Sequence, residues 1–306
     1  MLLAFKQKTY NINFGNLGRR THLCGKKLSI AIPASVVSDI PHLREKTSKM
    51  GLIGRAAAIF RVDEIIIYPD NPKISQRADM DLIATLLTYM ETPQYLRKRL
   101  FMLKPELQYA GILPPLRTAH HPLNRKVENL KEGEYREGVT LSKTKEGVLV
   151  DIGVEKPALI MKGQEPIGKR ITLKIRKVDR QIEAELANRN DIPEYWGYTV
   201  AVERFLFGKM VESRNFDLTI ATSRYGVPFA DEVQRIDRDW KDASTILAAF
   251  GAPTKGLNEI VKQEGLKLED IADFVVNTIP KQGTETVRTE EALIASLAIF
   301  NTYFRL

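Results

Sequence analysis

The sequence predicts an α/β protein with a mostly parallel β-sheet and a small β-barrel inserted into it. Apolar runs alternate with helical patterns over the first part of the chain, which is typical of parallel strands joined by helices. Between about residues 134 and 186 the pattern changes to short strands with Gly-bearing turns, and after Pro193 the α/β pattern resumes. We therefore expect one discontinuous domain, residues 1–115 and 191–306, around a barrel domain, residues 116–190.

The first part of the chain is expected to contain two strands that each precede a helix. The Ile-rich runs at residues 27–33 and 63–68 are typical of buried strands. Apolar residues recur at helical spacing over residues 39–60 and 77–90. A shorter amphipathic helix is expected at residues 92–103, before a Pro-rich linker.

Five short strands are expected in the inserted segment, for which an OB-fold is the natural candidate. They are residues 135–141, 148–154, 158–161, 170–178 and 181–186. Residues 116–190 carry 16 Lys and Arg against 11 Asp and Glu, which is most of the net charge of +8. Such barrels bind oligonucleotides, but Tyr135 is the sole aromatic residue of these strands. We therefore expect contacts to an RNA backbone to outweigh base stacking.

Two groups of basic residues are candidates for RNA contact. The first is the triplet Arg97, Lys98 and Arg99, for which an ordinary solvated helix face is the competing interpretation. The second group lies on the expected barrel and comprises Lys143, Lys145, Lys174, Arg176 and Lys177.

The last part of the chain is expected to add four strands and three helices to the sheet domain. The strands are residues 199–205, 216–221, 244–250 and 274–279, and the helices are residues 229–240, 257–263 and 289–304. Thr289 has the side chain of an N-cap, and Glu290 and Glu291 favour the first turn of that helix. A stripe of apolar residues, either core or interface, runs along the same helix: Leu293, Leu297, Phe300 and Phe304.

Three Gly-bearing loops follow three consecutive strands of this last part, at residues 222–226, 251–256 and 280–284. Loops at the carboxyl ends of parallel strands converge on one crevice, which is the usual ligand position. With the residues that flank them, these loops carry charges of both signs. They suit a ligand with an adenosine part and a zwitterionic part better than a polyphosphate.

Several classes of protein are excluded by missing motifs. Gly251 and Gly256 have the spacing of a phosphate-binding loop, but Leu257 and Asn258 stand where Lys and Ser or Thr are required. No Gly-x-Gly-x-x-Gly follows the first strand, and no Gly-x-Ser-x-Gly or His-Glu-x-x-His occurs. Neither a secretory signal peptide nor a membrane-spanning run is recognisable, so we expect a cytoplasmic protein without membrane association.

Metal binding is not expected. The single cysteine, Cys24, permits neither an intrachain disulfide nor a thiolate metal cluster, and there are only four histidines. His120 and His121 are adjacent in the Pro-rich linker. We expect them to be ordinary surface residues.

The chain resembles the SPOUT superfamily of methyltransferases, in the archaeal and eukaryotic branch with an inserted OB-like domain. The resemblance rests on five motifs that together span nearly the whole chain: residues 29–33 (SIAIP), 55–64 (RAAAIFRVDE), 221–226 (ATSRYG), 250–253 (FGAP) and 288–292 (RTEEA). It implies a deep C-terminal trefoil knot, bound S-adenosylmethionine, a homodimer, and RNA as substrate. The RNA implied is ribosomal RNA, with methylation at N3 of a uridine.

The resemblance also implies which residues form the site. Arg224 is expected to be catalytic and to contact the cofactor or the target base. The expected cofactor-binding residues are Thr222, Arg224, Gly251, Pro253, Gly256, Ile279, Gln282, Gly283, Thr284, Val287 and Thr289. Arg288 and Glu290 either belong to the same site or form a structural ion pair that closes the knot.

Removal of the N3 proton of uracil requires assistance, and no cysteine or histidine lies in the three loops. Arg224 could stabilise a uridinate oxygen, or a carboxylate such as Asp231 or Glu232 could accept the proton.

Two other functions stay open at this point. A non-catalytic RNA-binding or ribosome-assembly protein could retain the same fold, although it would not need glycines in all three loops. A methyltransferase of small molecules is disfavoured by the basic inserted barrel.

Overall fold

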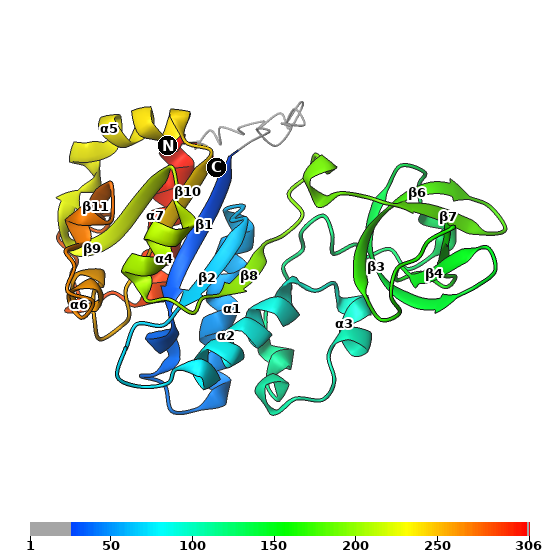
Figure 1. Ribbon diagram of the computed structural model, residues 1–306, viewed down its shortest axis with the longest axis horizontal. Coiled ribbons are helices and arrows are strands. Elements are labelled where there is room, and N and C mark those ends of the chain that lie inside the picture. The colour runs from blue at the N-terminus through cyan, green and yellow to red at the C-terminus, as the bar shows by residue number, and fades with distance from the viewer. Residues whose placement is uncertain (1–25, 305) are drawn as a thin grey trace, which may run out of the picture.

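The computed structural model describes residues 26–304 and 306, and its centre is a six-stranded sheet (Figure 1). The strands are β1 Lys27–Pro33, β2 Glu64–Tyr68, β8 Thr199–Val202, β9 Leu218–Pro228, β10 Thr245–Ala249 and β11 Phe274–Asn277. They lie in the order β11-β9-β10-β1-β2-β8, and every pairing between neighbours is parallel. The predicted parallel sheet is therefore confirmed. Cys24 and the segment inspected for a signal peptide lie outside the described residues.

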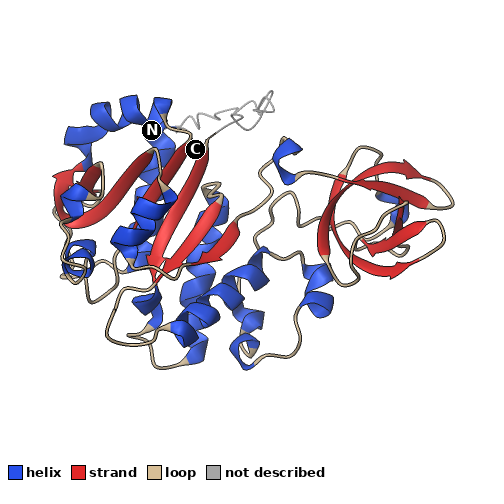
Figure 2. Ribbon diagram, in the orientation of Figure 1, coloured by secondary structure: helices blue, strands red, loops and turns tan. Residues whose placement is uncertain are grey.

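Helices cover both faces of the sheet (Figures 1 and 2). On one face lie α1 Leu43–Ile59, α2 Arg77–Glu91, α5 Phe229–Asp242 and α7 Thr289–Phe304. On the other face lie α4 Phe207–Arg214 and α6 Leu257–Lys262. A further helix, α3 Gln94–Leu100, contacts the first strand of the barrel.

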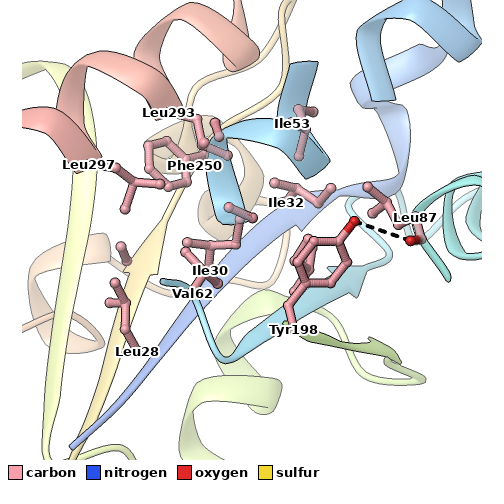
Figure 3. Close-up of a cluster of buried hydrophobic side chains, with 14 of the residues drawn as sticks. Leu28, Ile30, Ile32, Ile53, Val62, Leu87, Tyr198, Phe250, Leu293 and Leu297 are labelled. Carbon is pink, nitrogen blue, oxygen red and sulfur yellow. Dashed lines mark hydrogen bonds between the residues drawn. The ribbon is translucent and has the colours of Figure 1, made fainter. Parts of the chain in front are cut away.

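The side chains of β1 explain why the sheet is covered on both faces. Successive side chains of a strand point to opposite faces, so a strand buried on both faces is apolar throughout. Ile30 and Ile32 belong to the larger apolar cluster, whereas Ala31 belongs to the cluster on the opposite face. Figure 3 shows Ile30 and Ile32 beside side chains of α1 and α7, with the hydroxyl of Tyr198 donating to the carbonyl oxygen of Leu87 at 3.2 Å.

The apolar stripe of α7 is core within this chain. Leu293, Leu297 and Phe300 are completely buried. Phe304 is partly buried and stacks on Trp240 of α5, with ring centroids 4.5 Å apart. The stripe therefore holds α7 against the sheet and is not available to a partner.

The inserted segment forms a closed barrel of five strands, as predicted (Figure 2). The strands are β3 Tyr135–Lys143, β4 Gly147–Asp151, β5 Ala158–Met161, β6 Arg170–Val178 and β7 Ile182–Leu186. The barrel has its own apolar core and lies beyond the β8 edge of the sheet (Figure 1). Leu116 packs in the core of the sheet domain and Val127 against the core of the barrel, so the chain crosses between them. The predicted boundaries after residues 115 and 190 stay predictions.

A buried network of charged groups joins the barrel to the sheet domain. Glu91, the last residue of α2, pairs with Arg170 of β6 at 2.6 Å (Oε2 to Nη1). The same guanidinium pairs with Glu137 of β3 at 2.6 Å, and Glu137 also accepts a hydrogen bond from the indole N–H of Trp196. Burial raises the pKa of Glu91, but a hydrogen bond from His120 and the charge of Arg170 outweigh it and lower the pKa to about 2.

The prediction that His120 and His121 are surface residues is wrong for His120, whereas His121 is half-buried. His120 is completely buried, and Nε2 of each ring lies within 2.8 Å of the carbonyl oxygen of Glu91. The helix C-terminus leaves that carbonyl without a helical partner, so the two imidazoles satisfy it. Burial, reinforced by the neighbouring His120, lowers the pKa of His121 to about 4.

Four elements of the sheet domain differ from the sequence predictions. α4 was not predicted, because it is a short helix of eight residues with a weak apolar pattern. β9 continues to Pro228, through residues 222–226 that were expected to form a loop. β8 ends at Val202 and β11 at Asn277, which is earlier than expected. Among the helices of the described residues, none is long and apolar enough to cross a membrane.

Candidate functional site

A cavity of about 220 Å³ opens at the carboxyl ends of β9, β10 and β11. Its walls come from all three loops that the sequence singled out and from the start of α7. It lies on the β11 side of the sheet, whereas the barrel lies beyond β8 (Figure 1). The convergence of the loops follows from the parallel sheet, because neighbouring parallel strands all end at the same edge.

The first wall is a bulge within β9. Ala221 pairs with Val275 of β11, and Val227 pairs with the next residue, Val276. The five residues 222–226 are therefore extruded between two consecutive partners. A bulge of this kind redirects side chains next to a site, and here it turns Thr222, Ser223, Arg224 and Tyr225 toward the cavity.

Asn277 fixes the bulge to the third loop. Its Nδ2 donates to the carbonyl oxygen of Arg224 at 2.9 Å, and its Oδ1 accepts from the N–H of Ile279 at 2.9 Å. The Arg224 guanidinium donates from Nη1 to the carbonyl oxygen of Glu285 at 3.1 Å, and from Nη2 to the hydroxyl of Tyr225. The bulge and the third loop are thus joined by the Asn277 side chain from one side and the Arg224 side chain from the other.

Gly251 lets the second loop fold closely onto α6. A Cβ at this position would lie 3.0 Å from the backbone nitrogen of Leu257 and 3.1 Å from Cα of Gly256. The hydroxyl of Thr289 donates to the carbonyl oxygen of Gly251 at 2.9 Å. This bond connects the end of β10 to the start of α7, across the cavity wall.

Nine of the eleven predicted cofactor-binding residues line the cavity: Thr222, Arg224, Gly251, Pro253, Gly256, Ile279, Gln282, Val287 and Thr289. Gly283 and Thr284 are not among the lining residues. Gln282 Nε2 instead donates to the carbonyl oxygens of Thr284 and Glu285, which turns this part of the loop back on itself. Their assignment to the cofactor stays a prediction.

Sequence reasoning missed several lining residues, among them Tyr225, Phe250, Lys255, Glu259 and Asn277. Tyr225 was part of a quoted motif, and its place between Arg224 and Gly226 in a strand-end loop was the available signal. Asn277 and Glu259 were assigned to a strand and a helix, where local pattern gives no indication of a site.

Lys255 and Glu259 add charges of both signs to the lining beside Arg224. Among the described lining residues, Glu259 is the one carboxylate. Asp231 and Glu232, the carboxylates considered as proton acceptors, lie in the first turn of α5 and do not line the cavity. Glu232 is paired with Arg235 at 2.8 Å. Neither carboxylate is therefore placed to accept a proton in this cavity.

The start of α7 differs from expectation in two contacts. Thr289 is the first residue of the helix, and its hydroxyl bonds to Gly251 instead of capping the helix. Glu290 does not pair with Arg288: its Oε2 lies 3.4 Å from Nζ of Lys49 on α1, and both side chains are buried. The expected Arg288–Glu290 ion pair is therefore replaced by a contact that holds α7 to α1.

Most of the basic residues considered for RNA contact have partners within the chain. Arg97 donates to the carbonyl oxygens of Met90 and Thr92, and Arg99 pairs with Asp151 at 2.6 Å. The other engaged side chains and their partners are Lys143 with Gln164, Lys174 with Tyr135, Arg176 with Glu185 and Lys177 with Asp179. Lys98 and Lys145 are exposed. RNA contact by these residues stays a prediction. Lys98 and Lys145 are the best candidates for it.

The described residues contain no group of three or more His, Cys, Asp or Glu side chains that could hold a metal ion. The charged side chains that line the cavity are Arg224, Lys255 and Glu259, beside the backbone groups of the three loops.

Comparison with known proteins gives a family for the chain. The model of a family described as "Putative RNA methyltransferase" matches residues 27–300. An uncharacterized protein of Halobacterium salinarum is 34% identical over 292 residues, which cover 88% of this chain and 96% of that protein. The "28S rRNA (uridine-N(3))-methyltransferase" of Homo sapiens is 30% identical over 297 residues, 89% of this chain and 77% of the human protein. The protein of the same name from Drosophila melanogaster is 32% identical, and the match covers 89% of this chain and 61% of that protein.

Proposed function

This chain belongs to the RNA methyltransferase family whose model it matches, and we propose that it transfers a methyl group from S-adenosylmethionine to N3 of a uridine in ribosomal RNA. The observation that carries the proposal is the cavity itself, which is lined by three loops at the carboxyl ends of parallel strands. The names of the human and fly relatives give the base, the atom and the RNA. The family model spans residues 27–300 and so includes the barrel, which supports a nucleic-acid substrate over a small molecule.

The lining residues fit S-adenosylmethionine. Ile279 and Val287 provide apolar surface for an adenine ring, and the carbonyl and N–H groups of the third loop can bind its edge. Lys255 and Glu259 can pair with the carboxylate and the ammonium of the methionine part. Because Gly251 has no side chain, the backbone of the second loop can approach the cofactor closely.

The chemistry that the cofactor supplies is an electrophilic methyl group on a sulfonium. The protein must hold the base in line with that group and promote loss of the N3 proton. We assign the second task to Arg224, whose exposed guanidinium can donate hydrogen bonds to a carbonyl oxygen of uracil. Negative charge develops on that oxygen as N3 loses its proton, so a fixed cation beside it lowers the pKa of N3–H. The proton can then pass to water at the open mouth of the cavity.

We also propose the deep trefoil knot and the homodimer that the SPOUT resemblance implies. The C-terminal segment is held against two earlier strands, as such a knot requires: Thr289 bonds to the end of β10, and Arg224 of β9 bonds to Glu285 before α7. Because the apolar stripe of α7 is buried in this chain, the dimer must use other residues. Exposed apolar side chains of α1 and α7 support such an interface: Leu52, Ile59, Ile294 and Tyr303.

Isothermal titration with S-adenosylmethionine, followed by methylation of ribosomal RNA with a labelled cofactor, tests the proposal. We expect binding of the cofactor and label in 3-methyluridine after nuclease digestion and mass spectrometry. Binding without transfer to any RNA would favour the non-catalytic ribosome-assembly protein. No binding at high micromolar cofactor would exclude the methyltransferase.

A further inference from the structure

An exposed aromatic ring stands in the wall of the cavity, and the proposed reaction has not used it. Tyr225, in the β9 bulge, is 74% exposed and lines the cavity. The other aromatic lining residue, Phe250, is buried. Among the described residues, Tyr225 is thus the one ring of the lining that a ligand can reach.

The backbone on both sides of Tyr225 is held in place. Its N–H donates to the side-chain oxygen of Ser223 at 3.2 Å, and Asn277 holds the carbonyl oxygen of Arg224. On the other side, a Cβ at Gly226 would lie 2.7 Å from the carbonyl oxygen of Val275. A glycine is needed there, because only without a side chain can the bulge return to its pairing with β11. The backbone that carries the ring is therefore fixed by the fold.

A cation lies against the ring. The Arg224 guanidinium carbon is 4.6 Å from the ring centroid, and Nη2 bonds to the ring hydroxyl. The guanidinium and the ring thus form one surface with two chemistries: a π face and a set of N–H donors. A pyrimidine base presents the complement, a flat ring with carbonyl oxygens at its edge.

We propose that Tyr225 is the stacking platform for the target uracil, and that it holds the base with its carbonyl edge toward Arg224. The inference rests on the proposed function, since a base that is methylated at N3 must leave its pairing partner and lose its neighbours in the stack. Stacking on an aromatic side chain replaces part of that lost contact. The barrel strands have Tyr135 as their one aromatic residue, and its ring is half-buried, packs against Trp196 and does not line the cavity. Tyr225 is better placed than the barrel to stack on a base.

The test compares Tyr225→Ala, Tyr225→Phe and a control, Phe205→Ala, in the full chain. Phe205 is also partly exposed, with Nζ of Lys209 4.7 Å from its ring centroid, but it does not line the cavity. The probes are a fluorescein-labelled short oligouridylate for binding and ribosomal RNA as methyl acceptor. Titration with S-adenosylmethionine and sedimentation of each variant report cofactor binding and oligomeric state.

Tyr225→Ala should weaken oligouridylate binding about 5- to 100-fold and raise KM for RNA, as expected for loss of one stacked base. Cofactor affinity and sedimentation should not change. Tyr225→Phe keeps the ring and should bind like the wild type, as should Phe205→Ala. Unchanged RNA binding and KM in Tyr225→Ala, with an active wild type, would overturn the platform and leave the proposed function intact.

A change of oligomeric state in Tyr225→Ala would also overturn the inference, because it would assign the ring to an interface between two copies of the chain. The experiment can also support the stacking role of Tyr225 while contradicting the proposed reaction. A wild type that binds oligouridylate through Tyr225 but transfers no methyl group would support the platform and overturn the proposed reaction.

Discussion

Glu91 and Arg170 form an ion pair at 2.6 Å that joins the end of α2 to the barrel strand β6. The Glu91 side chain is 6% exposed, so its charge is compensated almost entirely by protein groups. Arg170 and Arg189 approach it from the barrel side, and His120 from the linker. Glu91 is therefore one of the groups that fix the two domains relative to each other, beside the pairs Trp196–Glu137 and Arg99–Asp151.

Replacing Glu91 by Ala should destabilise the protein by about 3–5 kcal/mol, because it leaves buried cationic groups without their partner. The matched control is Glu128→Ala, which breaks an exposed pair with Lys126 and should cost less than about 1 kcal/mol. Urea unfolding of both variants measures the difference. Equal losses of unfolding free energy would show that the network does not hold the domains together.

Acid should destabilise the protein in two steps. The folded pKa of His121 is about 4 against an ordinary 6.5, so its contribution is complete above pH 6.5 and is lost as pH falls toward 4. The folded pKa of Glu91 is about 2 against 4.5, so its contribution is lost between pH 4.5 and 2. In His121→Gln the loss of stability between pH 6.5 and 4 should become smaller, and the loss between pH 4.5 and 2 should remain. Replacement of the exposed His42 should change neither loss. Measurement of Tm against pH tests both expectations. An unchanged loss between pH 6.5 and 4 in His121→Gln would contradict its assignment to His121.

Arg224→Ala should lower kcat for RNA methylation about 10²- to 10³-fold, which is the usual loss when one donor to a developing oxyanion is removed. Its activity should rise further with pH than that of the wild type, because the N3–H pKa is no longer lowered. Arg224→Lys keeps the charge and should recover part of the rate. Initial rates between pH 6 and 10 measure both effects, and a pH profile identical to that of the wild type would exclude the assigned role.

Gly251→Ala and Gly283→Ala should differ in their effect on cofactor binding. A Cβ at Gly251 would meet backbone atoms of Leu257 and Gly256, whereas nothing lies within 4 Å of a Cβ at Gly283. We expect Gly251→Ala to weaken S-adenosylmethionine binding at least about tenfold by shifting the second loop, since no flexible side chain can move aside. Gly283→Ala should bind normally. Calorimetric titration measures both; weakened binding by Gly283→Ala alone would favour the sequence assignment of that loop.

Much of the fold could be predicted from local pattern. The strands β1 and β2, the helix α2 and all five barrel strands lie within a few residues of their predicted bounds. Period-two and period-3.6 recurrence of apolar residues, with Gly and Pro at the turns, is a local property of the sequence. The alternation of strands and helices then leaves a parallel sheet as the simplest arrangement.

The candidate site was predictable in outline. Loops after consecutive parallel strands meet at one edge, so the positions of Thr222, Gly251 and Gln282 followed from chain order. The bulge in β9 did not, because the strand resumes after residues 222–226 only through the pairing of Val227 with Val276 of β11, about 50 residues later.

Local pattern in the sequence was enough to predict most elements of this protein, their order and the three loops that approach one another. The tertiary structure decided which side chains of those loops reach the cavity, that the α7 stripe is core, and that Glu290 pairs with Lys49 and Glu91 with Arg170. The physical reason is separation along the chain. Periodicity describes residues a few positions apart, whereas these contacts join residues 79 to 241 positions apart, and only the packed sheet and barrel bring them together.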